Sequence, residues 1–344
     1  MATRRYAPGR IRSTFARRPF DATLVRGMGP AAPGREWPRM SDRRSQSRWR
    51  AWAELLRLPN LLTVPGDPLA GAALAAGALP VGGVPAAVWA AAAALCLYAG
   101  GLALNDVADL EEDRRERPRR PLPSGRIAPG AALAAGLALL AAGVGFAFAA
   151  GRQAGLVGAG LAALIAAYDF ALKRTPFGPA AMGACRAMSL LMGAAAVAPS
   201  IGPRAAVAAL GLGSYVAALT VLSRRETGGR TSAAPAAGPA AAVVFAAAAM
   251  LILAPRNWAC VPAPALVFAL AAVLAARAGR DWHAAGDPAR RPPCIGRMVR
   301  NLTALQAAFV LASPAPPSAA AAAAIALLAA GFLHGVLARR IAAS

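Results

Sequence analysis

Ten apolar segments, each about as long as a bilayer is thick, constrain this chain more than any other feature. A helix needs roughly 20 predominantly apolar residues to cross the hydrocarbon core. Because lipid satisfies no backbone polar group, such runs predict helices. We therefore expect an all-α fold, a polytopic transmembrane bundle of nine or ten helices. The segments lie at about residues 58–80, 85–105, 128–150, 153–171, 178–199, 204–222, 234–254, 258–276, 298–314 and 318–338.

Composition supports a membrane domain over residues 50–341 with no separate soluble domain. The chain is 58% hydrophobic and 15% charged, whereas a soluble domain carries about 25% charged residues. Residues 1–49 are rich in arginine, poor in acids and lack the apolar core of a secretory signal. We interpret them as a disordered cytoplasmic segment. An organelle transit peptide, or a start codon placed too early, would have the same composition.

Cationic residues lie mostly in every second loop. With the N-terminus in the cytoplasm, the inner loops carry seventeen and the outer loops carry only Arg152, Arg204 and Arg256. Such an excess marks the cytoplasmic side. It also accounts for much of the net charge of +22, so we expect no nucleic-acid partner. The alanine and arginine bias is typical of a bacterial chain, which indicates the inner (plasma) membrane.

The stretch NDVADLEEDRRERPRRPLPSG, which begins at the end of the second apolar segment, holds six of the chain's fifteen acidic residues. Asn105, Asp109 and Asp113 are spaced i, i+4, i+8, which places them on one face of a helix. A line of carboxylates repels itself unless a cation binds. Mg²⁺ takes hard oxygen ligands and leaves positions for substrate phosphates, and the arginines that follow suit the remaining oxygens. The stretch predicts a lipid-like diphosphate as ligand, although charge alone also allows a solvated loop.

The order N-D-x-x-D-x-x-x-D, continued by R-P-x-R-P-L-P-S-G, resembles the first aspartate-rich motif of the UbiA family of intramembrane prenyltransferases. The resemblance implies helices around a central cavity, a polyprenyl diphosphate donor, a lipophilic acceptor that is aromatic or of another kind, and Mg²⁺. With YDFALK, TPFGP and SRRE further on, the chain looks most like a divergent, EboC-like bacterial branch. The implied metal ligands are Asn105, Asp106, Asp109 and Asp113, and Arg120 is expected on the diphosphate.

A second polar cluster, YDFALKRTPFGP, lies between the fourth and fifth apolar segments on the same side of the membrane. Lys173, the only lysine of the chain, and Arg174 would bring two cations to the diphosphate. Family members carry a tyrosine four residues before this lysine; Tyr168 stands five before it and is also expected to bind substrate. Arg186 lies inside the fifth segment, where an ionisable side chain is costly and usually faces a cavity. We expect it to bind the diphosphate or a carboxylate, with a structural ion pair as the alternative.

Two further site residues follow from the resemblance. The loop after the sixth segment, SRRETGGRT, lacks the second motif, D-x-x-x-D, that family members commonly carry there. Glu226 is its only carboxylate and is expected to bind metal, so one-metal and two-metal chemistry both stay open. Asn60, in the first segment, matches an asparagine that family members place near the substrate pocket.

The first segment also contains V-P-G-D-P, whose prolines predict a local break in the helix around Asp67. A broken helix and the intramembrane charges Asp67 and Arg186 would also suit a transporter or ion-binding protein, although the chain shows no second copy of the pattern. A CDP-alcohol phosphotransferase would carry D-G-x-x-A-R, which is absent. The predicted function is a Mg²⁺-dependent membrane prenyltransferase with Asp109, Asp113 and Lys173 as catalytic residues.

Overall fold

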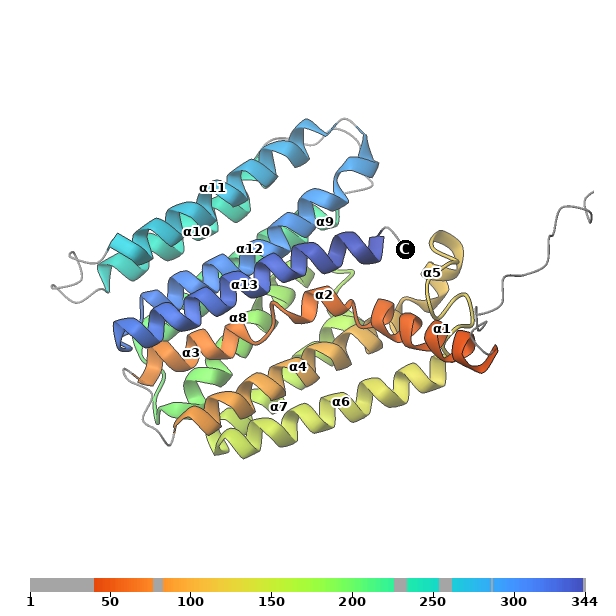
Figure 1. The fold of residues 1–344 in the computed structure, drawn as a ribbon, viewed down its shortest axis with the longest axis horizontal. Coiled ribbons are helices and arrows are strands. Elements are labelled where there is room, and N and C mark those ends of the chain that lie inside the picture. The colour runs from red at the N-terminus through yellow and green to blue at the C-terminus, as the bar shows by residue number, and fades with distance from the viewer. Residues whose placement is uncertain (1–39, 77–82, 226–233, 254–261, 286, 343–344) are drawn as a thin grey trace, which may run out of the picture. The chain divides into compact units, whose positions relative to one another are not determined.

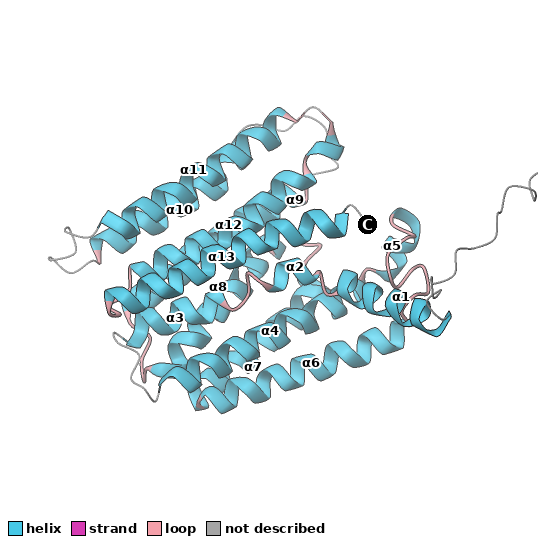
Figure 2. Ribbon diagram, in the orientation of Figure 1, coloured by secondary structure: helices cyan, strands magenta, loops and turns pink. Residues whose placement is uncertain are grey.

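The computed structural model describes residues 40–76, 83–225, 234–253, 262–285 and 287–342. Internal contacts divide the chain into Met1–Ser45 and Gln46–Ser344, and all side-chain contacts described below lie within the second unit. Its described residues form helices and connecting turns without a strand (Figures 1 and 2). The prediction of an all-α helical bundle is confirmed.

The helices follow the predicted apolar segments. The first segment becomes two short helices, and each of the others coincides with one helix. Eight helices are long and apolar enough to cross a membrane within the described residues: α4, α6, α7 with its π-helical extension η2, α8, α9, α10, α11 and α13. The elements are α1 (Met40–Leu55), α2 (Leu58–Leu61), α3 (Gly66–Ala76), α4 (Gly83–Ala108), α5 (Leu110–Glu116), α6 (Pro129–Ala150), α7 (Arg152–Ala167), η2 (Tyr168–Leu172), α8 (Gly178–Val197), α9 (Pro203–Ser223), α10 (Ala234–Ile252), α11 (Pro262–Ala284), η4 (Pro288–Arg290), α12 (Pro292–Leu311) and α13 (Pro317–Ala342).

The break in the first segment lies where its prolines predict it. α2 ends at Leu61 and α3 begins at Gly66, with Pro65 between them. Arg57, directly before α2, has a φ of 45°, an uncommon left-handed conformation for a residue with a side chain. This sharp turn separates α1 from α2, and it leaves the Arg57 side chain beside the end of α4, where it contacts Asp106.

Consecutive helices from α6 to α13 pack against each other, α4 packs against α6, and α3 packs against α4, α8 and α12 (Figure 1). Small residues allow the close approach of α3 and α8. A Cβ added at Gly193 would collide with the backbone of Pro68, and one at Gly183 with the backbone of Gly213 on α9. Such contacts are typical of membrane helices.

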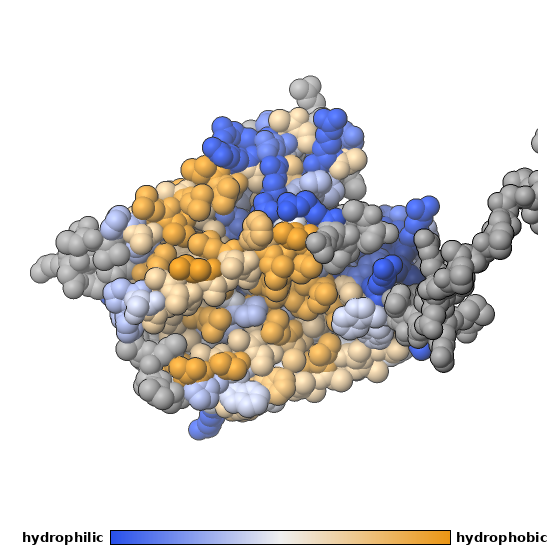
Figure 3. Space-filling view, in the orientation of Figure 1, coloured by the Kyte–Doolittle hydropathy of each residue, from blue (hydrophilic) through white to orange (hydrophobic). Residues whose placement is uncertain are grey.

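The outer surface of the helices is largely apolar (Figure 3). Large exposed side chains include Leu137, Phe148, Leu210, Ile252 and Phe332. Exposed apolar area on this scale marks a surface that another apolar phase covers. Hydrophilic side chains gather instead around α5 and near the junction of α11 and α12 (Figure 3).

Candidate active site

The acidic motif begins on the last turn of α4 and continues into α5, but not as one straight helix. Asp109 has φ −93° and ψ 2° and separates the two helices. Backbone N–H groups of Asp109 and Asp113 still donate to the carbonyls of Asn105 and Asp109. Asn105 and Asp109 therefore stay in contact, with Asn105 Nδ2 donating to Asp109 Oδ2 at 3.2 Å, whereas the Asp113 side chain meets a different set of cations.

Arg120 joins Asp106 and Asp113 on one side of the motif. Its Nη1 lies 2.7 Å from Asp113 Oδ2 and 4.0 Å from Asp106 Oδ1. Arg57 Nη2 donates to Asp106 Oδ1 at 3.3 Å, and Arg117 Nη1 lies 3.7 Å from Asp113 Oδ1. Both carboxylates are buried, and buried carboxylates are stable only with such partners.

Lys173 contacts the other half of the motif. Its Nζ pairs with the Asp109 carboxylate and donates to Asn105 Oδ1 at 3.2 Å. The preceding turn, η2, is π-helical: the Lys173 N–H donates to the Tyr168 carbonyl, five residues back, at 2.9 Å. This wider turn absorbs the extra residue between Tyr168 and Lys173. The two residues are one turn apart, as a spacing of four would place them on an α-helix.

The loop that carries Lys173 is fixed by Arg224, an arginine of the loop after the sixth apolar segment. Arg224, directly after α9, donates from Nη1 to the Thr175 carbonyl at 2.9 Å and from Nη2 to the Lys173 carbonyl. Arg174 is more exposed, and its Nη2 lies 2.9 Å from Glu112 and 3.6 Å from Asp109. Many inner-loop arginines share the sequence context of Arg224, so only the fold distinguishes it.

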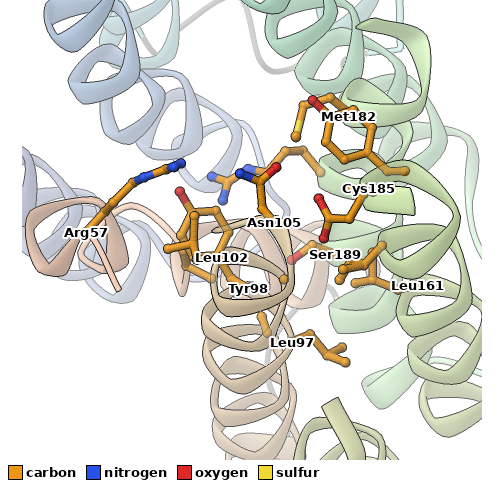
Figure 4. A pocket seen from close by; sticks show the side chains of 16 residues that line it. Arg57, Leu97, Tyr98, Leu102, Asn105, Leu161, Met182, Cys185 and Ser189 are labelled. Carbon is orange, nitrogen blue, oxygen red and sulfur yellow. The ribbon is translucent and has the colours of Figure 1, made fainter. Parts of the chain in front are cut away.

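A cavity of about 110 Å³ lies beside these charges, between α4, α7 with η2, and α8. Arg57 and Asn105 approach it from the charged end of the bundle, and Leu97, Leu161 and Met182 line its apolar walls (Figure 4). Of the residues predicted for the site, Asn105, Tyr168 and Arg186 line this cavity.

Asp169 also lines the cavity and was missed in the sequence. It is 5% exposed, and its Oδ2 has no hydrogen-bond partner among the described residues. A buried polar atom without a partner is costly, so its position against a cavity points to a ligand. The available signal was an ionisable residue in the last turn of an apolar segment, the same signal that singled out Arg186.

Arg186 is held by partners away from the charged motif. Its Nε lies 2.9 Å from Asp67 Oδ2, and its Nη2 donates to the Thr63 carbonyl at 3.0 Å. Gln306 Nε2 donates to Asp67 Oδ1 at 2.6 Å and to the same Thr63 carbonyl at 2.8 Å. The structural ion pair that the sequence left open is therefore present, and it connects α8, α12 and the break before α3.

Asn60, which was predicted for the site, contacts a different helix. Asn60 Oδ1 lies 3.0 Å from His334 Nε2 on α13, and Asn60 is not among the residues that line the cavity. Glu226 lies outside the described residues.

The donor set suits a Mg²⁺ ion that binds together with a diphosphate. Within the described ranges, no three carboxylate, histidine or cysteine side chains are grouped as a metal site of their own. The protein oxygens of Asn105, Asp106, Asp109 and Asp113 are hard ligands, however, and Asp169 Oδ2 is a further oxygen without a partner. Mg²⁺ is usually held by one or two carboxylates together with substrate phosphates and water, so these residues fit that mode and not a closed protein cage.

The fold and this site define a class: helical membrane proteins with an acidic and cationic site at one end of an apolar cavity. The profile of the UbiA prenyltransferase family matches residues 68–293, and the chain belongs to that family. It is an integral membrane protein.

Several archaeal proteins are similar to this chain in sequence. The digeranylgeranylglyceryl phosphate synthase of Ignicoccus hospitalis is 39% identical over 164 residues, which cover 47% of this chain and 52% of that protein. The chain spans about half the length of the curated relatives it matches. The EboC-like bacterial branch and the bacterial membrane therefore stay predictions.

Solved structures share the fold. A UbiA homologue from Aeropyrum pernix K1 superposes with a TM-score of 0.56 at 19% identity, covering 73% of this chain and 97% of that one. A homologue from Archaeoglobus fulgidus, bound to GPP and Mg²⁺, gives 0.52 at 13% identity, covering 83% and 99%.

Proposed function

We propose that this protein transfers a prenyl group from a prenyl diphosphate to a lipophilic acceptor in a Mg²⁺-dependent reaction. The observation that carries the proposal is the meeting of the acidic motif with Arg57, Arg120 and Lys173 at the charged end of an apolar cavity. The family match favours this function over a transporter. In addition, the two charges that suggested transport, Asp67 and Arg186, neutralise each other.

The charged residues would bind the diphosphate of the donor. We assign Asn105, Asp106, Asp109 and Asp113 as oxygen ligands of Mg²⁺, which, when bound, would neutralise the leaving diphosphate. Arg120, Lys173 and Arg174 would exchange part of their contacts with the acids for phosphate oxygens. Because the Lys173 side chain is only 13% exposed, its attraction to a phosphate is less screened than that of a surface lysine.

The apolar walls would hold the prenyl chain and exclude water. The C–O bond between the chain and the diphosphate breaks, the diphosphate leaves with the electron pair, and the allylic cation is attacked by the acceptor. At about 110 Å³ the cavity is smaller than a typical ligand pocket of about 300–1,000 Å³. Donor binding must therefore displace side chains, and the flexible Met182 is the wall residue best able to move.

Asp169 is placed to take the proton of the acceptor. Asp169 lines the cavity, and its Oδ2 has no hydrogen-bond partner among the described residues, so we assign this carboxylate as the general base for a bound hydroxyl. A new C–O bond then forms between the acceptor oxygen and the prenyl carbon. The archaeal relatives are digeranylgeranylglyceryl phosphate synthases, which favours a glyceryl phosphate lipid with a free hydroxyl over an aromatic acceptor.

Purified protein in nanodiscs tests the proposal. Donors of several chain lengths are supplied with a glyceryl phosphate lipid or with an aromatic acid, and both diphosphate release and product mass are measured. We expect a prenylated glyceryl phosphate product and no release after EDTA treatment, with recovery on adding Mg²⁺. No product with any donor, or release that is insensitive to EDTA, would contradict the proposal.

A further inference from the structure

A second cavity, of about 540 Å³, lies between α11, α12 and α13, and none of its lining residues belongs to the first. Four arginines line it: Arg277 on α11, Arg297 and Arg300 on α12, and Arg339 on α13. The end of α11, the start of α12 and the end of α13 all lie toward the end of the bundle that carries α5 (Figure 1). The cavity is therefore cationic and is built at one end of the membrane-spanning helices.

Most of this positive charge has no carboxylate partner among the described residues. Arg297 Nη2 lies 2.8 Å from Asp281 Oδ2. Across the described residues, no carboxylate pairs with Arg277, Arg300 or Arg339. The seventeen cations assigned to inner loops from the sequence include Arg277, Arg297 and Arg300, but the structure places these three within helices α11 and α12, where they line one cavity. Like charges brought together in this way repel each other unless an anion binds.

Small residues on α13 leave room for Arg300 on α12. Gly331 and Gly335, four residues apart on α13, face α12. A Cβ added at Gly335 would stand 2.6 Å from Arg300 Nη1, and one at Gly331 would overlap the Thr303 side chain. The glycine face of α13 therefore leaves the space that the Arg300 guanidinium occupies beside the cavity.

The walls beside the arginines are apolar and face outward. Leu270 and Leu274 on α11, and Leu328 and Phe332 on α13, line the cavity, and Phe332 is 74% exposed. Figure 3 shows hydrophilic side chains between the apolar surfaces of α11 and α13. A cationic cavity with apolar walls that open toward the lipid suits an amphiphile with an anionic head.

We propose that this cavity binds the phosphate headgroup of an anionic membrane lipid, with the acyl chains lying along Leu270 and Phe332. Arginine suits phosphate oxygens because its planar fork donates two parallel hydrogen bonds. Basic pockets between transmembrane helices recognise such headgroups. The site is separate from the prenyl-transfer cavity, so its occupancy does not depend on the proposed activity.

Lipid retention measured by native mass spectrometry tests the site. Protein is exchanged from nanodiscs of phosphatidylglycerol or of phosphatidylcholine, and the bound lipid is counted for the native chain and for the double variant Arg277→Gln/Arg300→Gln. Arg280→Gln is the matched control, because Arg280 is an exposed α11 arginine that does not line the cavity. Each arginine near an anionic headgroup contributes about 1 kcal/mol, so the double variant should retain phosphatidylglycerol at least about tenfold more weakly, with the control unchanged.

Three results would overturn the proposal: equal retention of the two lipids by the native chain, the same loss in Arg280→Gln as in the double variant, or displacement of the lipid by millimolar inorganic phosphate, which would assign the site to a soluble anion. If the double variant fails to fold, Arg339→Gln replaces it. Arg339 is exposed near the end of α13, so its loss leaves the packing of Arg300 intact. The expected weakening is then about fivefold, from the loss of one phosphate contact.

Discussion

Arg186 Nε lies 2.9 Å from Asp67 Oδ2, and this ion pair joins the middle of α8 to the break in the first transmembrane segment. Both residues are buried, and Gln306 on α12 hydrogen-bonds to the same carboxylate. The break frees backbone carbonyls, and the Thr63 carbonyl accepts hydrogen bonds from both Arg186 and Gln306. The pair therefore satisfies irregular backbone at a depth where lipid cannot.

Removing one partner of this pair should destabilise the protein. Arg186→Gln leaves the Asp67 charge buried, a change that typically costs about 3–5 kcal/mol. The double variant Asp67→Asn/Arg186→Gln removes both charges and should recover part of the loss. Thermal midpoints of the native chain, the two single variants and the double variant give the coupling directly. Strictly additive effects would show that the two side chains do not stabilise each other.

Asp109 should be essential for turnover. Asp109→Asn keeps the shape of the side chain but removes the charge that we assign to Mg²⁺, so diphosphate release should fall at least about a hundredfold while the thermal midpoint changes little. Glu111→Gln is the matched control, because Glu111 is an exposed acid of the same motif that pairs with Arg114. If Asp109→Asn keeps activity close to that of the native chain, Asp109 is not a ligand of the metal.

Lys173 and Arg174 are adjacent but should differ strongly in their contribution. The Lys173 side chain is 13% exposed and contacts both Asn105 and Asp109, whereas that of Arg174 is 65% exposed. Exposed charges are screened and contribute little. Lys173→Met should therefore raise the KM for the donor, or lower kcat, by at least about tenfold, and Arg174→Gln by less than about threefold. Steady-state kinetics over donor concentration separate the two, and equal effects would contradict this ranking.

Local pattern predicted the helices, the break near Asp67 and the charged motif, because each depends on residues close together in the chain. The contacts of Arg186 could not be predicted in the same way. They join residues more than a hundred positions apart, and the sequence left both a ligand role and an ion pair open. In the sequence, the π-helical turn before Lys173 was visible only as a spacing of five residues from Tyr168, where family members have four. Neighbouring residues alone do not show whether such a spacing means an extra residue within one turn or a tyrosine at a different position. Asp169 was missed because its burial and lack of a partner are properties of the packed helices.

The loops that carry Asp109 and Lys173 are expected to face the cytoplasm. In a background without cysteine, Arg115→Cys should resist a membrane-impermeant thiol reagent in intact cells and react after lysis. Arg152→Cys, at the start of α7 and exposed, should react from outside. The expectation rests on the excess of cationic residues in the inner loops. Labelling of Arg115→Cys in intact cells would show that this loop faces outward, contrary to the expected topology.

Because the second aspartate-rich motif is missing, Asp169 and Glu226 are the two carboxylates whose roles in metal binding and proton transfer need to be separated. If Glu226 supplies the carboxylate opposite the first motif, Glu226→Gln should raise the Mg²⁺ concentration needed for half-maximal activity. Asp169→Asn, by contrast, removes the proposed proton acceptor, so it should lower kcat by about 10²–10⁴-fold without changing the Mg²⁺ requirement. Titrating Mg²⁺ at saturating donor and acceptor distinguishes the two effects. The opposite result would be a raised Mg²⁺ requirement in Asp169→Asn and an unchanged one in Glu226→Gln. It would show that Asp169, which lines the cavity, binds the metal and that Glu226 in the loop after α9 does not.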